Sequence, residues 1–185
     1  MVSLESYALI KAAQAGDHDA FEQVLTAHYD TLYRFAYRWC GNRADAEDIT
    51  QQACMKLALS INQFRFEAAF SSWLYRLVIN CAKDWYKSQN RHQHDNIDDW
   101  IEPEPTPDQT AENRIYLQQL LRLLDQMSDG FKETALLVHG EGLSHAEAAA
   151  ILQVKESTIS WRLHDIRKQL QLLQQQPDGS WELSL

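Results

Sequence analysis

The chain has 185 residues, of which 45% are hydrophobic and 23% charged, a balance typical of globular proteins that argues against disorder along its whole length. Six glycines and four prolines are too few for an all-β fold with many tight turns, and the lack of a long apolar run or a signal peptide favours a cytoplasmic protein without membrane insertion. The net charge of −9 would oppose contact with nucleic acid if it were spread evenly over the chain.

The first half of the chain has the hydrophobic periodicity of about four helices. A short helix comes first, and Asp17 then suits the N-cap of a second helix, which Gly41 ends. Asp45 can cap a third helix, with acidic residues in its first turn where the helix dipole favours them. A loop follows, and a fourth helix begins near Ser71. We therefore expect a compact helical domain.

Basic and aromatic side chains alternate through residues 64–91, which hold five basic and seven aromatic residues. Such a surface suits single-stranded nucleic acid, because cations pair with phosphates and aromatic rings stack on bases. Lys83 and Lys87 lie one helical turn apart and share a face. The alternative interpretation is that most of these rings belong to the core and that the basic residues form an ordinary solvated face.

An acidic segment separates the two halves of the chain. Residues 92–113 carry seven acidic side chains and no basic one, whereas the rest of the chain is close to neutral. Three prolines at alternate positions forbid a helix in this segment. We therefore predict a linker at residues 92–113 between two domains, residues 1–91 and 114–173, with a tail at 174–185.

Residues 114–173 predict four further helices. An amphipathic helix and a helix over Phe131–His139 come first, and two glycines end the latter. Ser144 and Glu147 form a capping-box pattern that opens a short helix, and a tight turn leads to a longer helix with one apolar stripe. This is the layout of a helix-turn-helix, whose second helix enters a major groove. Spacing alone leaves an ordinary αα-hairpin of a helix bundle equally open.

The sequence gives no sign of catalysis, a metal site or another cofactor. Cys40, Cys54 and Cys81 are widely spaced and form no Cys-x-x-Cys pair, so we interpret them as small buried hydrophobic residues. A nucleophile, a base and an orienting group cannot be named together. We therefore predict that the chain is not an enzyme and needs no cofactor.

Four segments of the chain resemble signatures of bacterial sigma factors. AEDITQQ resembles the pattern AED-hydrophobic-x-Q-E, and AFSSWLYR, with the asparagine and aspartate that follow it, resembles F-x-x-W-L-Y-R-x-x-x-N-x-x-x-D. GLSHAEAA and STISWR resemble G-L-S-x-x-E-I-A and G-T-V-x-S-R. The four segments occupy residues 46–52, 69–84, 142–149 and 157–162. Their order and spacing resemble the extracytoplasmic-function (ECF) class, the short sigma factors that keep only the second and fourth sigma regions.

This resemblance implies an all-α fold of two small helical domains, one like sigma region 2 and one like the helix-turn-helix of sigma region 4, joined by a flexible linker. It also implies a factor that directs RNA polymerase to promoters and initiates transcription, held inactive by an anti-sigma factor. The expected site on core RNA polymerase is the clamp helices of its largest subunit. The residues at the family's polymerase-binding positions are Asp48, Gln51 and Gln52.

Promoter DNA is the other partner that the resemblance implies. The residues at the positions that open and bind the minus-ten element are Arg65, Ser71, Tyr75, Arg76, Asn80, Lys83 and Lys87. The residues at the positions that bind the minus-thirty-five element are Ser157, Thr158, Ser160, Trp161, Arg162 and Arg167. Trp73 and Leu74 are expected to pack inside the domain.

The chain departs from the family pattern at several positions. Gln52 replaces the usual glutamate and Ser157 replaces a glycine. In the second helix of the helix-turn-helix, Ser160 and Asp165 replace basic residues, and each lost cation removes one phosphate neutralisation. Two alternatives therefore stay open. One is a sigma-like mimic that binds an anti-sigma protein without binding DNA, and the other is a stand-alone helix-turn-helix regulator.

Overall fold

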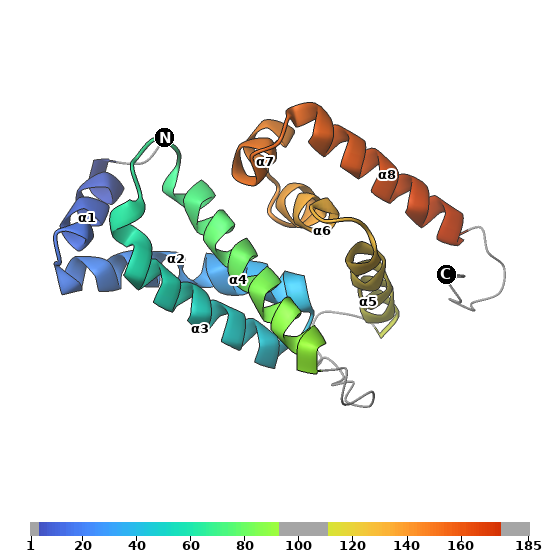
Figure 1. The fold of residues 1–185 in the computed structure, drawn as a ribbon, viewed down its shortest axis with the longest axis horizontal. Helices are drawn as coiled ribbons and strands as arrows, with labels where there is room; N and C mark the ends of the chain where they lie inside the picture. The colour runs from blue at the N-terminus through green and yellow to red at the C-terminus, as the bar shows by residue number, and fades with distance from the viewer. Residues whose placement is uncertain (1–3, 93–110, 175–185) are drawn as a thin grey trace.

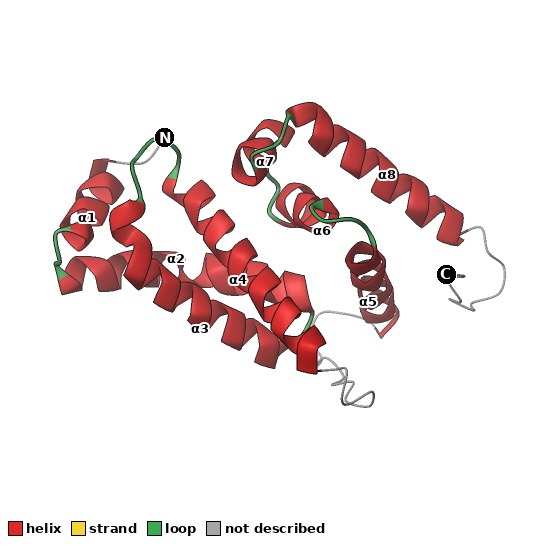
Figure 2. Cartoon of the chain, viewed as in Figure 1, coloured by secondary structure: helices red, strands yellow, loops and turns green. Residues whose placement is uncertain are grey.

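The computed structural model describes residues 4–92 and 111–174, and these residues form helices joined by loops and turns (Figure 2). The predicted all-α fold is confirmed for this part of the chain. Most of the predicted linker and of the tail lies outside the described residues, so the domain boundaries stay predictions. Within the described ranges, no helix combines the length and the apolar character that crossing a membrane requires.

The first domain is a bundle of four α-helices. They are α1 (Leu4–Gln14), α2 (His18–Cys40), α3 (Arg43–Ser60) and α4 (Phe70–His92), with the 3-10 turn η1 (Ile61–Gln63) after α3. Helices α2, α3 and α4 contact one another, and α1 packs on α2 (Figure 1). Phe35, Leu57 and Val78 are fully buried in the core that these helices share. Removing these side chains from water is what drives the bundle together.

Local hydrogen bonds set the ends of α2 and α3. Asp17 caps α2 as predicted, because its Oδ1 accepts a hydrogen bond from the Ala20 backbone N–H at 3.0 Å. Gly41 ends α2 with a φ of 78°, a left-handed conformation that glycine adopts without strain. The prediction that Asp45 caps α3 is wrong. Asn42 follows the glycine in an extended conformation, and its Oδ1 accepts from the Asp45 backbone N–H at 2.9 Å.

The second domain consists of the remaining helices. They are α5 (Ala111–Gln126), α6 (Phe131–Ala135), the π-helical turn η3 (Leu136–Gly140), α7 (His145–Leu152) and α8 (Glu156–Gln174). The helix predicted over Phe131–His139 is therefore present, but its second half is π-helical rather than α-helical. The Glu141 backbone N–H donates to the Leu136 carbonyl at 2.9 Å and closes the wider turn. Gly142, with a φ of 71°, then leads the chain away from the helix axis.

Helices α7 and α8 form the predicted helix-turn-helix layout. Ser144 Oγ accepts from the Glu147 backbone N–H at 3.2 Å, and the Glu147 carboxylate accepts from the Ser144 backbone N–H at 2.8 Å. The predicted capping box is therefore confirmed. Gln153 ends α7 in a left-handed conformation with a φ of 56°, which turns the chain into α8. Ala149 and Ile159, one on each helix, are both buried.

Replacing Gly130 by alanine is expected to destabilise the protein by about 1–3 kcal/mol. Gly130 has a φ of 92°, and the guanidinium of Arg162 occupies the space that a Cβ would take. An alanine would strain the backbone and displace Arg162 from its hydrogen bonds with Thr134 Oγ1 and the Asp129 carbonyl, both at 3.4 Å. Urea unfolding followed by circular dichroism measures the change in the free energy of unfolding.

Gly16 provides a matched control for this substitution. It has a φ of 93°, and nothing lies within 4 Å of the Cβ that alanine would add. Alanine at Gly16 therefore tests backbone strain alone, whereas alanine at Gly130 tests strain together with the displaced Arg162. Equal destabilisation by the two substitutions would mean that the packing of Arg162 contributes nothing.

Candidate functional site

One face of α3 is polar and open to solvent. Asp48, Gln51 and Gln52 are all exposed. On the opposite side of the helix, Ile49 and Ala53 are fully buried in the core of the first domain, which fixes the side of α3 that faces outward. A carboxylate and two amides held on one rigid helix can pair with arginine and with backbone groups of another protein.

Two large apolar side chains extend this face and were missed by the sequence reasoning. Met55 is 61% exposed and Leu59 is 82% exposed. They follow Asp48 and Gln52 at intervals of three and four residues, so all four lie on one side of α3. Adjacent exposed apolar side chains on a helix are typical of a protein contact surface. The sequence signal that could have revealed these two residues is their four-residue spacing on α3, on a different side of the helix from the buried Ile49 and Ala53.

Four of the seven residues predicted to bind the minus-ten element are exposed to solvent. These residues are Arg65, Ser71, Asn80 and Lys87. Arg65 lies in the loop before α4, and the other three lie along α4 itself. Two exposed cations and two exposed hydrogen-bonding side chains can meet the phosphates and base edges of a nucleic-acid strand.

Tyr75 is one of three side chains that surround the Glu141 carboxylate at the contact between the two domains. Its hydroxyl donates to Glu141 Oε2 at 2.8 Å, and Arg34 Nη2 donates to the same oxygen at 2.9 Å. Arg38 pairs with the other oxygen of Glu141, whose side chain is only 2% exposed. Burial raises the pKa of the Glu141 carboxyl, but the hydrogen bonds from Arg34 and Tyr75 and the charges of both arginines outweigh it, so its pKa is lowered overall. Glu141 is therefore a charged side chain that its partners shield almost completely from solvent.

Arg76 and Lys83 also contact the second domain. Arg76 Nη2 donates to the Ala150 carbonyl at 3.2 Å. Lys83 Nζ pairs with Asp129 at 2.7 Å and with Glu133 at 2.5 Å. Burial lowers the pKa of Lys83, but its bonds to the two carboxylates outweigh burial, so that its pKa is raised overall. Acidic groups of the second domain thus neutralise one cation of α4, Lys83, whereas Arg76 meets only a backbone carbonyl.

The aromatic rings around the start of α4 pack on one another. Phe64 and Phe70 are buried with their ring centroids 5.0 Å apart, and Trp73 stacks on Phe70 at 5.6 Å. Phe66 packs against Phe64 at 4.7 Å and has a φ of 61°, an unusual conformation for a residue with a side chain. Lys11 Nζ lies 4.6 Å from the Phe66 ring centroid. The interpretation of these rings as part of the core is therefore confirmed.

Helix α8 presents most of the residues predicted to bind the minus-thirty-five element. Ser157, Ser160, Trp161 and Arg167 are exposed, and Thr158 is partly exposed. The Trp161 side chain is 57% exposed. Its ring packs edge-to-face against the Phe131 ring, with the two ring centroids 5.3 Å apart. Arg162 instead turns back onto its own domain, where it donates to Thr134 Oγ1 and to the Asp129 carbonyl. The outer surface of α8 therefore offers one exposed indole and few cations.

Two family models match the chain. Residues 24–92 match Sigma-70 region 2, and residues 117–170 match Sigma-70, region 4. The first match begins within α2 and extends through α3 and α4, and the second match extends from α5 into α8. The polar face of α3, the basic side of α4 and the outer surface of α8 all lie within these matches.

Several curated proteins are similar over most of this chain. The ECF RNA polymerase sigma factor SigM of Mycobacterium tuberculosis is 32% identical over 164 residues, which cover 88% of this chain and 81% of that protein. SigW of Bacillus subtilis is 27% identical over 180 residues, which cover 87% of this chain and 94% of that protein. SigE of Mycolicibacterium smegmatis is 30% identical over 155 residues, which cover 82% of this chain but only 60% of the longer SigE.

Two solved structures have a similar fold. CnrH, in complex with the cytosolic domain of CnrY, superposes with a TM-score of 0.66 and 22% identity over 92% of this chain and 97% of CnrH. The sigma factor RpoE of Bartonella quintana, in complex with the anti-sigma factor NepR, superposes with a TM-score of 0.63 and 25% identity over 85% of this chain and 98% of RpoE.

Proposed function

Because the chain belongs to the extracytoplasmic-function (ECF) class of RNA polymerase sigma factors, we propose that it directs core RNA polymerase to promoter DNA in the cytoplasm and initiates transcription there without catalysis of its own. The observation that carries this proposal is the presence, within the matched region 2, of an exposed polar face on α3 beside a basic side on α4. The first surface suits a protein partner and the second suits a nucleic acid.

Core RNA polymerase binds through the face of α3 that carries Asp48, Gln51 and Gln52. These side chains are exposed and rigidly placed, and they complement arginines on the clamp helices of the largest subunit. Met55 and Leu59 extend the same face and supply apolar surface that is removed from contact with water when the complex forms. Because Gln52 is neutral, hydrogen bonds and apolar contact contribute more here than they would with the family's usual glutamate.

Promoter DNA binds through both domains. In the first domain, Arg65 and the exposed side of α4 capture the opened minus-ten element. In the second domain, α8 docks at the minus-thirty-five element with Trp161 as its largest exposed side chain. The two modules act on one DNA molecule, so a weak contact in each still gives specific binding when the linker spans both sites.

An anti-sigma factor is the regulatory partner that fits this chain. The similar sigma factor RpoE of Bartonella quintana forms a complex with the anti-sigma factor NepR. A partner of that kind would act by covering the polymerase-binding or promoter-binding surfaces described above.

Substitutions on the two surfaces should separate the two activities. Alanine at Asp48 is expected to weaken the affinity for core RNA polymerase by about tenfold or more, because it removes a charge-assisted hydrogen bond. Alanine at Lys87 should leave that affinity within about twofold and reduce run-off transcription, because it removes one phosphate neutralisation. Fluorescence anisotropy measures polymerase binding, and run-off transcription uses a promoter found by mapping transcription starts after overexpression.

Alanine at Arg76 or Lys83 should likewise impair promoter opening more than polymerase binding. Both residues also contact the second domain, so Lys87 and Asn80, which are exposed, give the cleaner comparison. Wild-type transcription from variants at both surfaces would show that the sites are wrongly assigned. A chain that binds an anti-sigma protein but never initiates transcription with core polymerase would instead be the sigma-like mimic.

A further inference from the structure

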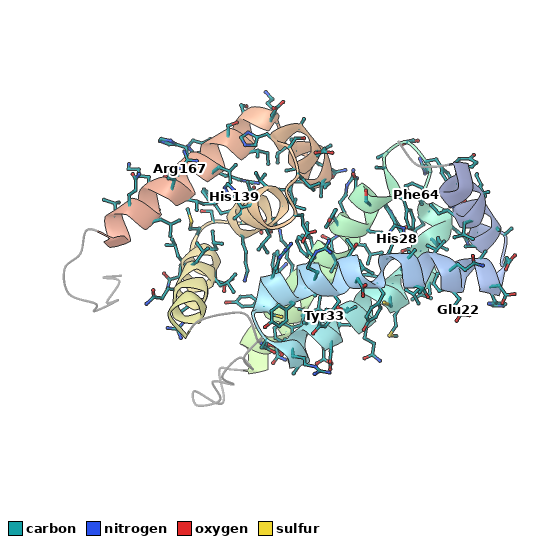
Figure 3. The ribbon with its side chains drawn as sticks, turned by 180° about the vertical axis from the view of Figure 1, so that it is seen from behind. Glu22, His28, Tyr33, Phe64, His139 and Arg167 are labelled. Atoms are coloured by element: carbon teal, nitrogen blue, oxygen red, sulfur yellow. The ribbon has the colours of Figure 1, made fainter. Side chains whose placement is uncertain are left out.

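Helix α1 lies outside the part of the chain that matches Sigma-70 region 2, which begins at residue 24. It packs on α2 at the end of the first domain away from the second (Figure 1). There it contacts the loop of residues 64–69, which carries Arg65 and is called the minus-ten loop from here on. Figure 3 shows Phe64 between α1 and the start of α4. The side chains that join α1 to this loop therefore bear on how Arg65 is held.

Gln14, in the last turn of α1, holds the start of the minus-ten loop. Its Nε2 donates to the Ile61 carbonyl and to the Phe64 carbonyl, both at 2.8 Å. An amide NH₂ has the two donors that two carbonyls need, and it brings no charge into their surroundings. The Phe64 carbonyl belongs to the planar peptide unit that joins Phe64 to Arg65. This hydrogen bond therefore fixes the direction in which the chain enters Arg65.

Phe66 fixes the chain on the other side of Arg65. Its φ of 61° is a left-handed conformation, which a residue with a side chain keeps only where its surroundings hold it there. The Tyr7 and Phe66 ring centroids are 4.5 Å apart, and Lys11 Nζ lies 4.6 Å from the Phe66 centroid. Two side chains of α1 therefore hold this ring and, through it, the strained backbone.

Arg65 lies between these two fixed residues and is itself exposed. Among the described residues, its guanidinium has no hydrogen-bond or ion-pair partner. The guanidinium can therefore pair with a phosphate without first leaving another group. Because the backbone before and after Arg65 is held in advance, less conformational entropy is lost when a DNA strand binds. A cation on a loosely held loop would bind the same strand more weakly.

We propose that α1 is a clamp on the minus-ten loop and that Gln14 is a positioning residue, which presents Arg65 to the opened DNA strand. The inference rests on the proposed function of Arg65. Gln14 acts through the peptide unit before Arg65, and Tyr7 and Lys11 act through Phe66. Loss of either contact loosens the loop and weakens capture of the strand, whereas the polymerase-binding face of α3 keeps its place.

The substitution Gln14→Met tests the clamp in the free full-length chain. Methionine has a similar length and helix propensity to glutamine, but its side chain has no donor. Hydrogen exchange measured by mass spectrometry should become about tenfold faster in residues 61–69 and stay unchanged in α3. Gln23→Met on α2 is the matched control, because it makes the same replacement at an exposed position. The control should leave exchange in both segments unchanged.

Run-off transcription with core polymerase tests whether Gln14 acts through Arg65. Gln14→Met should reduce transcription by about three- to tenfold, while the affinity for core polymerase stays within about twofold. Arg65→Ala should also reduce transcription. Adding Gln14→Met to Arg65→Ala should cause no further loss, because the side chain that Gln14 positions is then absent. A merely structural role of Gln14 would instead add its own loss to that of Arg65→Ala.

Tyr7→Ala guards against a folding defect in Gln14→Met. The Tyr7 side chain is 45% exposed, so its loss should hardly affect folding, yet it should also speed exchange in residues 61–69. Tyr29→Ala, at a residue that is 43% exposed, should not. Unchanged exchange in either α1 variant, additive losses of transcription, or full transcription from Arg65→Ala would each overturn the proposal. Failure of the wild-type chain to initiate transcription would instead overturn the proposed function, while faster exchange in both α1 variants would still establish the clamp.

Discussion

Alanine in place of Phe35 is expected to lower the free energy of unfolding by about 3–5 kcal/mol. Phe35 is fully buried in α2, its ring meets that of Tyr75 edge-on at 5.7 Å, and the ring of Trp39 lies 6.2 Å away. Removing the ring leaves a cavity between α2 and α4, because the helices that surround it can move only partly into the space. Urea unfolding monitored by circular dichroism should give a lower midpoint with an unchanged slope.

Tyr29 on the same helix is the control for this substitution. It is an aromatic residue that is 43% exposed, so alanine there should change the free energy of unfolding by no more than about 0.5 kcal/mol. A similar small effect at Phe35 would contradict the placement of its ring in the core. Because Phe35 supports Tyr75, its loss should also disturb the side of α4 that the promoter is proposed to bind.

The fold followed from the sequence wherever one local rule determined the outcome. Asp17 accepts the hydrogen bond expected of an N-cap, and Ser144 forms the reciprocal bonds of a capping box. These signals depend on residues a few positions apart, so a single sequence contains them. The start of α3 was misplaced because Asn42 and Asp45 are both good N-caps, and the left-handed Gly41 decided in favour of the first. The π-helical turn after α6 had no sequence signal that distinguished it from an α-helix.

The surfaces of the candidate site were predictable in part. The exposed polar face of α3 and the exposed residues of α8 follow from helical spacing together with the sigma-factor signatures. The hydrogen-bond partner of Tyr75 could not be predicted from the sequence, because Glu141 lies 66 positions away along the chain. No periodicity connects residues so far apart, and the acidic residues of the second half appeared only as a slightly negative net charge. The domain contact therefore had to be found in three dimensions.

The substitution Lys83→Glu should separate the contact between the two domains from DNA binding. It replaces the cation beside Asp129 and Glu133 by a third carboxylate, so the domains should part and the radius of gyration should rise. This variant should not gain affinity for single-stranded DNA, because Lys83 is itself one of the residues proposed to bind the phosphates. We expect run-off transcription to fall by about tenfold and the salt dependence of DNA binding to weaken by about one phosphate contact.

A charge swap identifies which of the two roles of Lys83 each measurement reports. Adding Glu133→Lys to Lys83→Glu restores an ion pair of opposite orientation, which should return the chain to the compact radius. Transcription should remain low in the swapped variant, because the phosphate contact is still missing from α4. Recovery of both transcription and the compact radius of gyration would mean that Lys83 serves only the domain contact and is not part of the minus-ten surface. A compact Lys83→Glu chain would instead show that the carboxylates of the second domain do not depend on this cation.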